Sequence, residues 1–291
     1  MFLRLLISGL VLGGIYGLIA LGYGLIYKAS GLMSFTQGDV LTLGAFLGLF
    51  FFDVLKLPYV VSLLLTVFLA FSFGFLLEKG VIRQLVKKNV MAIYVVLATI
   101  AVSYIIQNGV ERIWGSITLY FPSVFPVSSV KVLGTSIQPE ALMCVGISLL
   151  CMILLHFFMT KTRFGTAMRA SAMDPLAACS CGVNTSLTTG VTWGISAGLA
   201  AIGGMLIGPM YGVYAILGST LGRKGFSSAV IGGYGNMYGA MVGGLLLGLA
   251  ETFITGYVTS TYKNLIAYII LITFLFIKPT GLFNERAIQD S

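Results

Sequence analysis

MFLRLLISGLVLGGIYGLIALGYGLIY, residues 1–27, is an apolar run that is interrupted by a single charged residue, Arg4. A helix needs about 20 residues to cross the hydrocarbon core of a membrane, and this run exceeds that length. A basic residue near the start is typical of a signal peptide, but the run is too long and lacks a small-residue cleavage site. We therefore expect it to be retained as the first membrane-spanning helix.

The composition of the whole chain indicates the same solvent. Of the 291 residues, 58% are hydrophobic and 9% are charged, whereas soluble domains contain roughly 25% charged residues. The mean hydropathy is +1.01, and so much apolar surface requires lipid around it. The net charge of +8 does not indicate nucleic-acid binding, because the basic residues fall between apolar segments instead of gathering in one patch.

Eight apolar segments follow one another along the sequence, and two of them are short for a membrane span. The pattern predicts an all-α, polytopic membrane helix bundle in one transmembrane domain, residues 1–291, with at least one short or discontinuous helix. The segments cover roughly 3–27, 39–55, 58–82, 91–109, 140–159, 186–208, 226–250 and 264–278.

Basic residues predict the topology, because cytoplasmic loops carry an excess of Lys and Arg. The stretches Glu78–Lys88 and Lys161–Arg169 are both basic and are separated by an even number of spans, so both are expected in the cytoplasm. This assignment makes 111–139 an external loop, with a possible hairpin at 127–137, and makes 160–185 a cytoplasmic loop. Counting onward conflicts with the rule, since it places four basic residues outside: Arg223, Lys224, Lys278 and Arg286.

The conflict predicts that one C-terminal segment is broken or re-entrant, and the glycine-rich region 194–248 is the place for it. Glycines also recur every four residues in three ladders, which lets helix backbones approach closely: Gly9, Gly13 and Gly17; Gly204, Gly208 and Gly212; Gly235, Gly239 and Gly243. The stretches 34–48 and 225–244 resemble each other in composition, and an internal repeat remains open.

A short polar stretch, RASAMDPLAACSCGVN (169–184), lies between two apolar segments. Asp174 followed by Pro175 predicts a helix start, and Gly182 predicts its stop in a left-handed cap. The resulting helix has about two turns, or roughly 10 Å, and a helix that short needs packing against something to be stable. Two interpretations stay open: a helix that docks into a partner, or an interfacial helix that turns the chain.

Three stretches resemble the H-type permease subunits of branched-chain amino-acid ABC importers. They are FGTAMRASAMDPLAACSCGVN (164–184), FTQGDVLTLGAF (35–46) and GLLLGLAETFITGYVTSTYKNLIAYIILITFLFIKPTGLF (244–283). The resemblance covers essentially the whole chain, and its matches occur in the right order. It implies a subunit of an importer in the bacterial cell (inner) membrane that moves branched-chain or related amino acids.

The resemblance also implies partners: a second related permease subunit, two cytoplasmic ATPase subunits, and a periplasmic or lipid-anchored solute-binding protein. It identifies 174–182 as a coupling helix that contacts an ATPase. The residues carried over by position are Arg169, Ala170, Asp174, Pro175, Ala178, Gly182, Val183 and Asn184. The sequence departs from the family at Met173-Asp174-Pro175, where many members carry a charged pair, so the match to a particular ATPase stays open.

Several chemistries lack their residues in this sequence. No G-x-x-x-x-G-K-[ST] motif occurs, so ATP would be bound and hydrolysed by partner subunits, and we expect no cofactor on this chain and no enzyme activity. The four cysteines and the single histidine show no metal-ligand spacing, so no metal site is predicted. A channel needs rings of carbonyls or charges, and the glycine-rich stretch 231–244 offers little sign of that symmetry.

An ion-gradient-driven secondary transporter is the main alternative. Such a protein needs ionisable groups inside the membrane, and the sequence suggests no buried acid–base chain. Asp39 is expected to cap the second segment. Glu251 is the best single candidate for a functional acid, and capping or packing is the preferred role for it.

Small polar residues beside interrupted segments, together with Glu251, are the candidates for a substrate pathway, although the polar ones could equally cap helix starts. These residues are Ser34, Thr36, Gln37, Ser227, Ser228 and Glu251. The substrate stays open between leucine-like amino acids, urea, short amides and aromatic acids.

Overall fold

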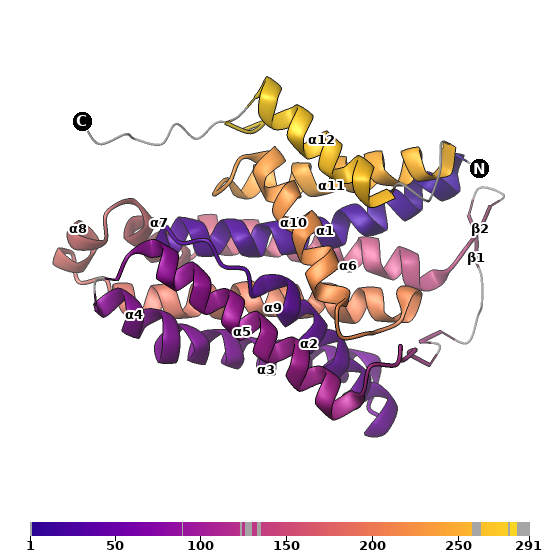
Figure 1. Cartoon of the computed structure of the whole chain (residues 1–291), viewed down its shortest axis with the longest axis horizontal. Coiled ribbons are helices and arrows are strands. Elements are labelled where there is room, and N and C mark those ends of the chain that lie inside the picture. Colours follow the sequence, from indigo (N-terminus) through magenta and orange to yellow (C-terminus); the bar gives the residue numbers. More distant parts are fainter. Residues whose placement is uncertain are drawn as a thin grey trace.

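The chain folds into a helix bundle whose long axis is set by six long helices (Figure 1). The computed structural model describes residues 2–88, 90–122, 124–125, 130–132, 135–257, 263–278 and 280–283. Within these ranges seven segments are long and apolar enough to cross a membrane, which confirms the predicted all-α, polytopic fold.

The elements, in chain order, are α1 (Phe2–Ser30), α2 (Gln37–Leu49), π-helical η1 (Phe50–Val54), α3 (Tyr59–Leu77), π-helical η2 (Glu78–Ile82), α4 (Arg83–Lys87), α5 (Ala92–Trp114), β1 (Val130–Val132), β2 (Thr135–Ile137), α6 (Pro139–Lys161), α7 (Arg163–Met173), α8 (Pro175–Ser180), α9 (Thr185–Tyr211), α10 (Leu217–Gly232), α11 (Met237–Tyr257) and α12 (Lys263–Ile277).

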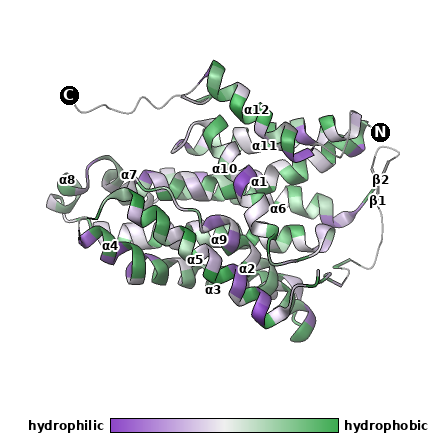
Figure 2. Ribbon diagram, viewed as in Figure 1, coloured by the Kyte–Doolittle hydropathy of each residue, from purple (hydrophilic) through white to green (hydrophobic). Residues whose placement is uncertain are grey.

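Helices α1 and α9 form the centre of the bundle. Residues 11–26 of α1 are buried without interruption, as expected of a helix that is apolar on every side. The predicted glycine ladder of α1 lets α11 approach closely, since a Cβ at Gly13 would lie 2.9 Å from the Cα of Leu245. By contrast, α3, α5 and α6 expose Leu, Ile, Phe and Tyr side chains on the outside, where Figure 2 is mostly green.

Two shorter helices, α2 and α10, cross inside the bundle. Chain segment 31–36 is non-helical and leads from the end of α1 back into the protein, where α2 begins. The crossing depends on Gly38 and Gly218, because a Cβ on either glycine would collide with the carbonyl oxygen of the other. The backbone N–H of Gly218 also donates to the hydroxyl of Thr42 at 2.8 Å.

The predicted single span 226–250 is wrong, because the chain breaks within it. Helix α10 ends at Gly232 and α11 begins at Met237, and the link contains two glycines with positive φ, Gly233 at +108° and Gly235 at +93°. The prediction of a broken C-terminal segment is therefore confirmed. The break adds one crossing of the bundle, so α12 runs back toward the end that carries α8 (Figure 1).

Contacts around the break support this direction. Gly235 and Asn236 line a cavity together with Lys28, at the end of α1, and Arg169 of α7. After α12, the backbone N–H of Leu282 donates to the carbonyl of Ile231 at 3.0 Å. Lys278 therefore lies on the side of the basic segments that are predicted to be cytoplasmic, in agreement with the charge rule, whereas Arg286 lies outside the described residues.

Two other expectations need correction. Arg223 and Lys224 do not lie in a loop but in the middle of α10. The basic stretch Glu78–Lys88 is not a loop either, because η2 and α4 continue α3 as one helical rod to Lys87. The internal repeat stays a prediction: of the two stretches compared for it, 34–48 leads into α2, and 225–244 includes the end of α10, the break and the start of α11.

The region between α5 and α6, which is predicted to be external, contains the predicted hairpin. Strands β1 and β2 pair antiparallel with Val132 opposite Thr135, and the intervening Gly134 lies outside the described residues. A single antiparallel bridge between Leu119 and Val213 ties this region to the link between α9 and α10. Helix α5 extends to Trp114, so the loop begins a few residues later than position 111.

Candidate functional site

The short helix α8 has the boundaries that the sequence predicts. The Asp174 carboxylate accepts hydrogen bonds from the backbone N–H groups of Leu176 (2.8 Å) and Ala177 (3.0 Å), and Pro175 occupies the first turn. At the other end, Gly182 has φ of +83°, and the Val183 N–H returns to the Ala178 carbonyl at 3.0 Å. Both ends of a helix of six residues are thus satisfied locally.

The side chains of this loop divide into inward and outward sets. Ala178 is buried, and Ala170 and Val183 are half-buried, whereas Arg169, Asp174, Pro175, Gly182 and Asn184 are exposed. Met173 and Leu176 are each 81% exposed although both are apolar. The end of α7 and the start of α8 therefore present two large apolar side chains, Met173 and Leu176, away from the rest of the protein, a surface that favours contact with a partner.

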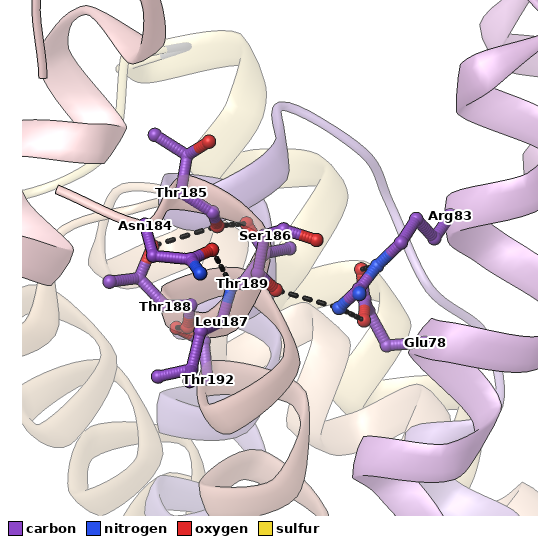
Figure 3. Close-up of polar contacts among 9 residues, drawn as sticks. All are labelled: Glu78, Arg83, Asn184, Thr185, Ser186, Leu187, Thr188, Thr189 and Thr192. Carbon is purple, nitrogen blue, oxygen red and sulfur yellow. Dashed lines mark hydrogen bonds and ion pairs between the residues drawn. The ribbon is translucent and has the colours of Figure 1, made fainter. Parts of the chain in front are cut away.

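The start of α9, which follows α8, is fixed by two sets of contacts (Figure 3). Asn184 caps α9 by accepting from the Leu187 N–H at 3.0 Å. Arg83 forms an ion pair with Glu78 and also donates to the Ser186 carbonyl at 2.7 Å. These contacts join the first turn of α9 to η2 and α4.

The brace made by Arg83 was missed in the sequence, where Arg83 counted as a loop charge. Its carbonyl partner lies 103 residues away in the chain, and no short-range pattern marks a backbone carbonyl as an acceptor. A charged pair five residues apart, Glu78 and Arg83, was the available signal.

A second site is a cavity of about 430 Å³ between α2, α5, α10 and α12. Asp39, in the first turn of α2, lines it but does not cap the helix as predicted. Its carboxylate accepts instead from the Gln107 side chain at 2.8 Å and from the Ser103 hydroxyl, both on α5. Asp39 was misassigned because its partners lie 64 and 68 residues away.

The predicted pathway residues do not gather in this cavity. Ser34 and Thr36 bond to each other at 2.8 Å, and the Gln37 amide exchanges hydrogen bonds with Ser196 of α9. The hydroxyls of Ser227 and Ser228 donate to carbonyls one turn earlier in α10. Of the six residues, Ser227 lines the cavity.

Glu251 belongs to a separate, closed cluster. Its carboxylate accepts from Lys224 of α10 at 2.6 Å and from the Tyr16 hydroxyl of α1 at 3.0 Å, and Lys263 lies 3.3 Å away. The sequence suggested no buried acid–base group, and this is corrected: Lys224 is 3% exposed and Glu251 is 1% exposed. The Lys224–Glu251 pair was not predicted because Lys224 was assigned to a loop.

Within the described part of the chain, no three His, Cys, Asp or Glu side chains gather as metal ligands would. What the structure offers is a closely packed bundle of membrane-spanning helices, two short inner helices beside a partly polar cavity, and a short capped helix, α8, at one end of the bundle. These features define a multi-pass membrane protein.

Sequence comparison identifies the family. Residues 5–275 match the model of the family described as branched-chain amino acid transport system, permease component, and the chain belongs to this family. It is therefore a permease component of a transport system and not an enzyme.

Two relatives show how far the similarity extends. The chain is 31% identical to the high-affinity branched-chain amino acid transport system permease protein LivH of Salmonella typhimurium, with 99% of this chain and 97% of that protein covered. It is also 31% identical, over the same shares of both chains, to the permease protein BraD of Pseudomonas aeruginosa.

The fold recurs in a solved structure, PsaBC from Streptococcus pneumoniae in complex with Fab. The TM-score is 0.50 at 14% sequence identity, and the similarity covers 95% of this chain and 92% of the other. This likeness concerns the fold alone.

Proposed function

We propose that the chain is the transmembrane permease subunit of an ATP-driven importer that carries branched-chain or related amino acids into the cytoplasm of a bacterial cell. The observation that carries the proposal is the match over nearly the full chain to permeases named for branched-chain amino acid transport. In this proposal the importer contains a second related permease subunit, two cytoplasmic ATPase subunits and a solute-binding protein.

The energy must come from another polypeptide, since the sequence has no phosphate-binding loop motif. We assign the contact with the ATPase to residues 174–182. Capping at both ends keeps α8 rigid, and its exposed Leu176, together with Met173 at the end of α7, can insert into an apolar groove of the ATPase. The residues Arg169, Ala170, Asp174, Pro175, Ala178, Gly182, Val183 and Asn184 either make this contact or set its shape.

Transmission to the membrane follows from the contacts of α8 with its neighbours. The Asn184 cap and the Arg83 brace connect α8 to the ends of α9 and α3, which cross the membrane. ATP-driven closure of the ATPases would therefore move these helices together as a rigid body.

The proposal is tested by purification from detergent-solubilised membranes of cells that produce the whole importer. We expect ATPase subunits and a second permease to co-purify with the natural chain. Replacing residues 174–182 by a Gly-Ser linker should release the ATPases and leave the second permease bound. A milder pair, Met173→Ala with Leu176→Ala, should weaken ATPase retention.

The matched control is Leu150→Ala with Leu154→Ala, two exposed leucines of α6 that are 53% and 57% exposed. This variant should retain the ATPases fully. Purification of the natural chain alone, together with leucine uptake driven by an ion gradient in vesicles, would refute the proposal and favour a secondary transporter.

A further inference from the structure

The membrane cavity contains a carboxylate without a counter-ion. Asp39 is 2% exposed, and its hydrogen-bond donors, Ser103 and Gln107, are both neutral. Among the described residues, no Lys or Arg lies within ion-pair distance of it. An ionised carboxylate is costly to bury inside a membrane, and such residues usually mark a functional site.

An unpaired positive charge lines the same cavity. Arg223 lies in the middle of α10, is exposed, and makes no side-chain hydrogen bond or ion pair within the described part of the chain. Its neighbour Lys224 points to the other side of α10, where Glu251 neutralises it. Figure 2 shows this polar stretch as purple in the middle of α10, away from the ends of the bundle.

The remaining lining combines apolar and aromatic surface with hydroxyl groups. Phe35, Ile100, Phe226 and Leu271 supply the apolar part, and Tyr104 and Tyr268 supply hydroxyls. The volume of about 430 Å³ falls in the range of about 300–1,000 Å³ that is typical of small-molecule sites.

We propose that this cavity is a binding site for the zwitterionic backbone of an apolar α-amino acid. Asp39 accepts the α-ammonium group, since an ionised carboxylate has about four acceptor positions and two donors occupy it here. Arg223 donates to the α-carboxylate, and the apolar lining contacts the side chain. The site deepens the proposed function and rests on it.

The test is equilibrium binding of radiolabelled leucine to the permease–ATPase complex in lipid nanodiscs, without the solute-binding protein. Unlabelled competitors separate the two charges: leucinamide keeps the ammonium and lacks the carboxylate, and 4-methylpentanoate keeps the carboxylate and lacks the ammonium. Each competitor should bind about tenfold more weakly than leucine, because each loses one charged hydrogen-bonding partner.

The variants should separate the contribution of the ammonium group to binding from that of the carboxylate group. Asp39→Asn should weaken the binding of leucine and leucinamide by about tenfold and leave that of 4-methylpentanoate unchanged. Arg223→Gln should weaken the binding of leucine and 4-methylpentanoate by about tenfold and leave that of leucinamide unchanged. Asp39→Glu keeps the charge and should retain most of the affinity. Asp53→Asn and Arg112→Gln, which change a partly exposed and an exposed charge outside the cavity, should bind leucine like the natural protein.

Leucine binding that is unchanged in both Asp39→Asn and Arg223→Gln would overturn the inference, as would the absence of leucine binding by the natural complex. A parallel assay of ATP-dependent leucine uptake, with the binding protein added, distinguishes failure of the cavity as a binding site from failure of the proposed function. If uptake persists while the site fails, the proposed function stands and the cavity is not the site. If the natural importer takes up no leucine, the proposed function fails.

Discussion

Single residues decide how this bundle tolerates charge inside it. The Lys224–Glu251 pair joins α10 to α11, and the Tyr16 hydroxyl adds a hydrogen bond from α1. Lone charges in these positions would be strongly unfavourable, whereas a paired and hydrogen-bonded arrangement offsets the loss of solvation. The pair therefore sets how α10 packs against α1 and α11, although it does not by itself add much to the free energy of unfolding.

We expect Glu251→Met to destabilise the protein more than Lys224→Met. The first substitution leaves Lys224 buried without an acceptor, and the second leaves Glu251 with Lys263 and Tyr16 as partners. Removing one member of a buried pair costs about 3–5 kcal/mol, and the double variant should recover much of the loss. Thermal unfolding of the purified permease in detergent, analysed as a double-mutant cycle, measures this.

The exposed pair of Asp53 and Lys56 provides the control, since its side chains are 43% and 76% exposed. Asp53→Asn should change stability by about 1 kcal/mol or less. Additive effects of the two buried substitutions would contradict the assignment of Lys224 and Glu251 as a coupled pair.

At the scale of elements, α8 is the clearest case of a helix specified by its ends. Its six residues are too few to form a stable helix alone, so the Asp174 cap, the first-turn proline and the Gly182 stop carry unusual weight. The space around Gly182 is open, with no atom within 4 Å of an added Cβ. Its backbone conformation, with φ of +83°, is therefore the reason for glycine at this position.

Gly182→Val should consequently disturb the end of α8 through the backbone alone. A β-branched residue in the left-handed region costs roughly 1–2 kcal/mol, so the loop should adopt another conformation and the exit into α9 should shift. We expect less amino acid imported per ATP hydrolysed at normal membrane levels of the protein, measured in proteoliposomes that contain the whole importer.

The matched control is Gly146→Val in α6, where an added Cβ also meets nothing within 4 Å but where the backbone is ordinary helix. It should leave the ratio of transport to hydrolysis unchanged. An equal ratio for both valine variants would argue against a mechanical role of α8.

At the scale of the whole molecule, the break after α10 decides the topology. It turns one expected span into two helices and brings Lys278 to the same side as the other basic segments. For Lys278 the charge bias and the path of the chain then agree, and Arg223 and Lys224 lie within α10 instead of in an external loop.

This topology predicts the accessibility of Lys278 from each side of the membrane. In a chain whose four native cysteines are replaced by alanine, Lys278→Cys should react with a membrane-impermeant maleimide after permeabilisation of the cells and not before. Tyr120→Cys, at a position that is 73% exposed on the external side, should react in both conditions. Labelling of Lys278→Cys in intact cells would refute the extra crossing.

The sequence by itself determined the membrane fold, most span positions, the glycine-mediated packing of α1 and both ends of α8. These features depend on local composition and spacing: apolar length fixes the spans, glycine spacing permits close helix contact, and Asp174, Pro175 and Gly182 act on backbone within a few residues of themselves.

Only the tertiary structure decided the break between α10 and α11, the roles of Asp39 and Lys224, and the brace from Arg83 to α9. In each case the deciding partner lies far away in the chain: Asp39 meets α5, Lys224 meets α11, and Arg83 meets the Ser186 carbonyl. The neighbouring residues in the sequence do not distinguish a charged residue in a loop from a charged residue in a buried ion pair. Its environment is set by which helices pack beside it, and that depends on the fold as a whole.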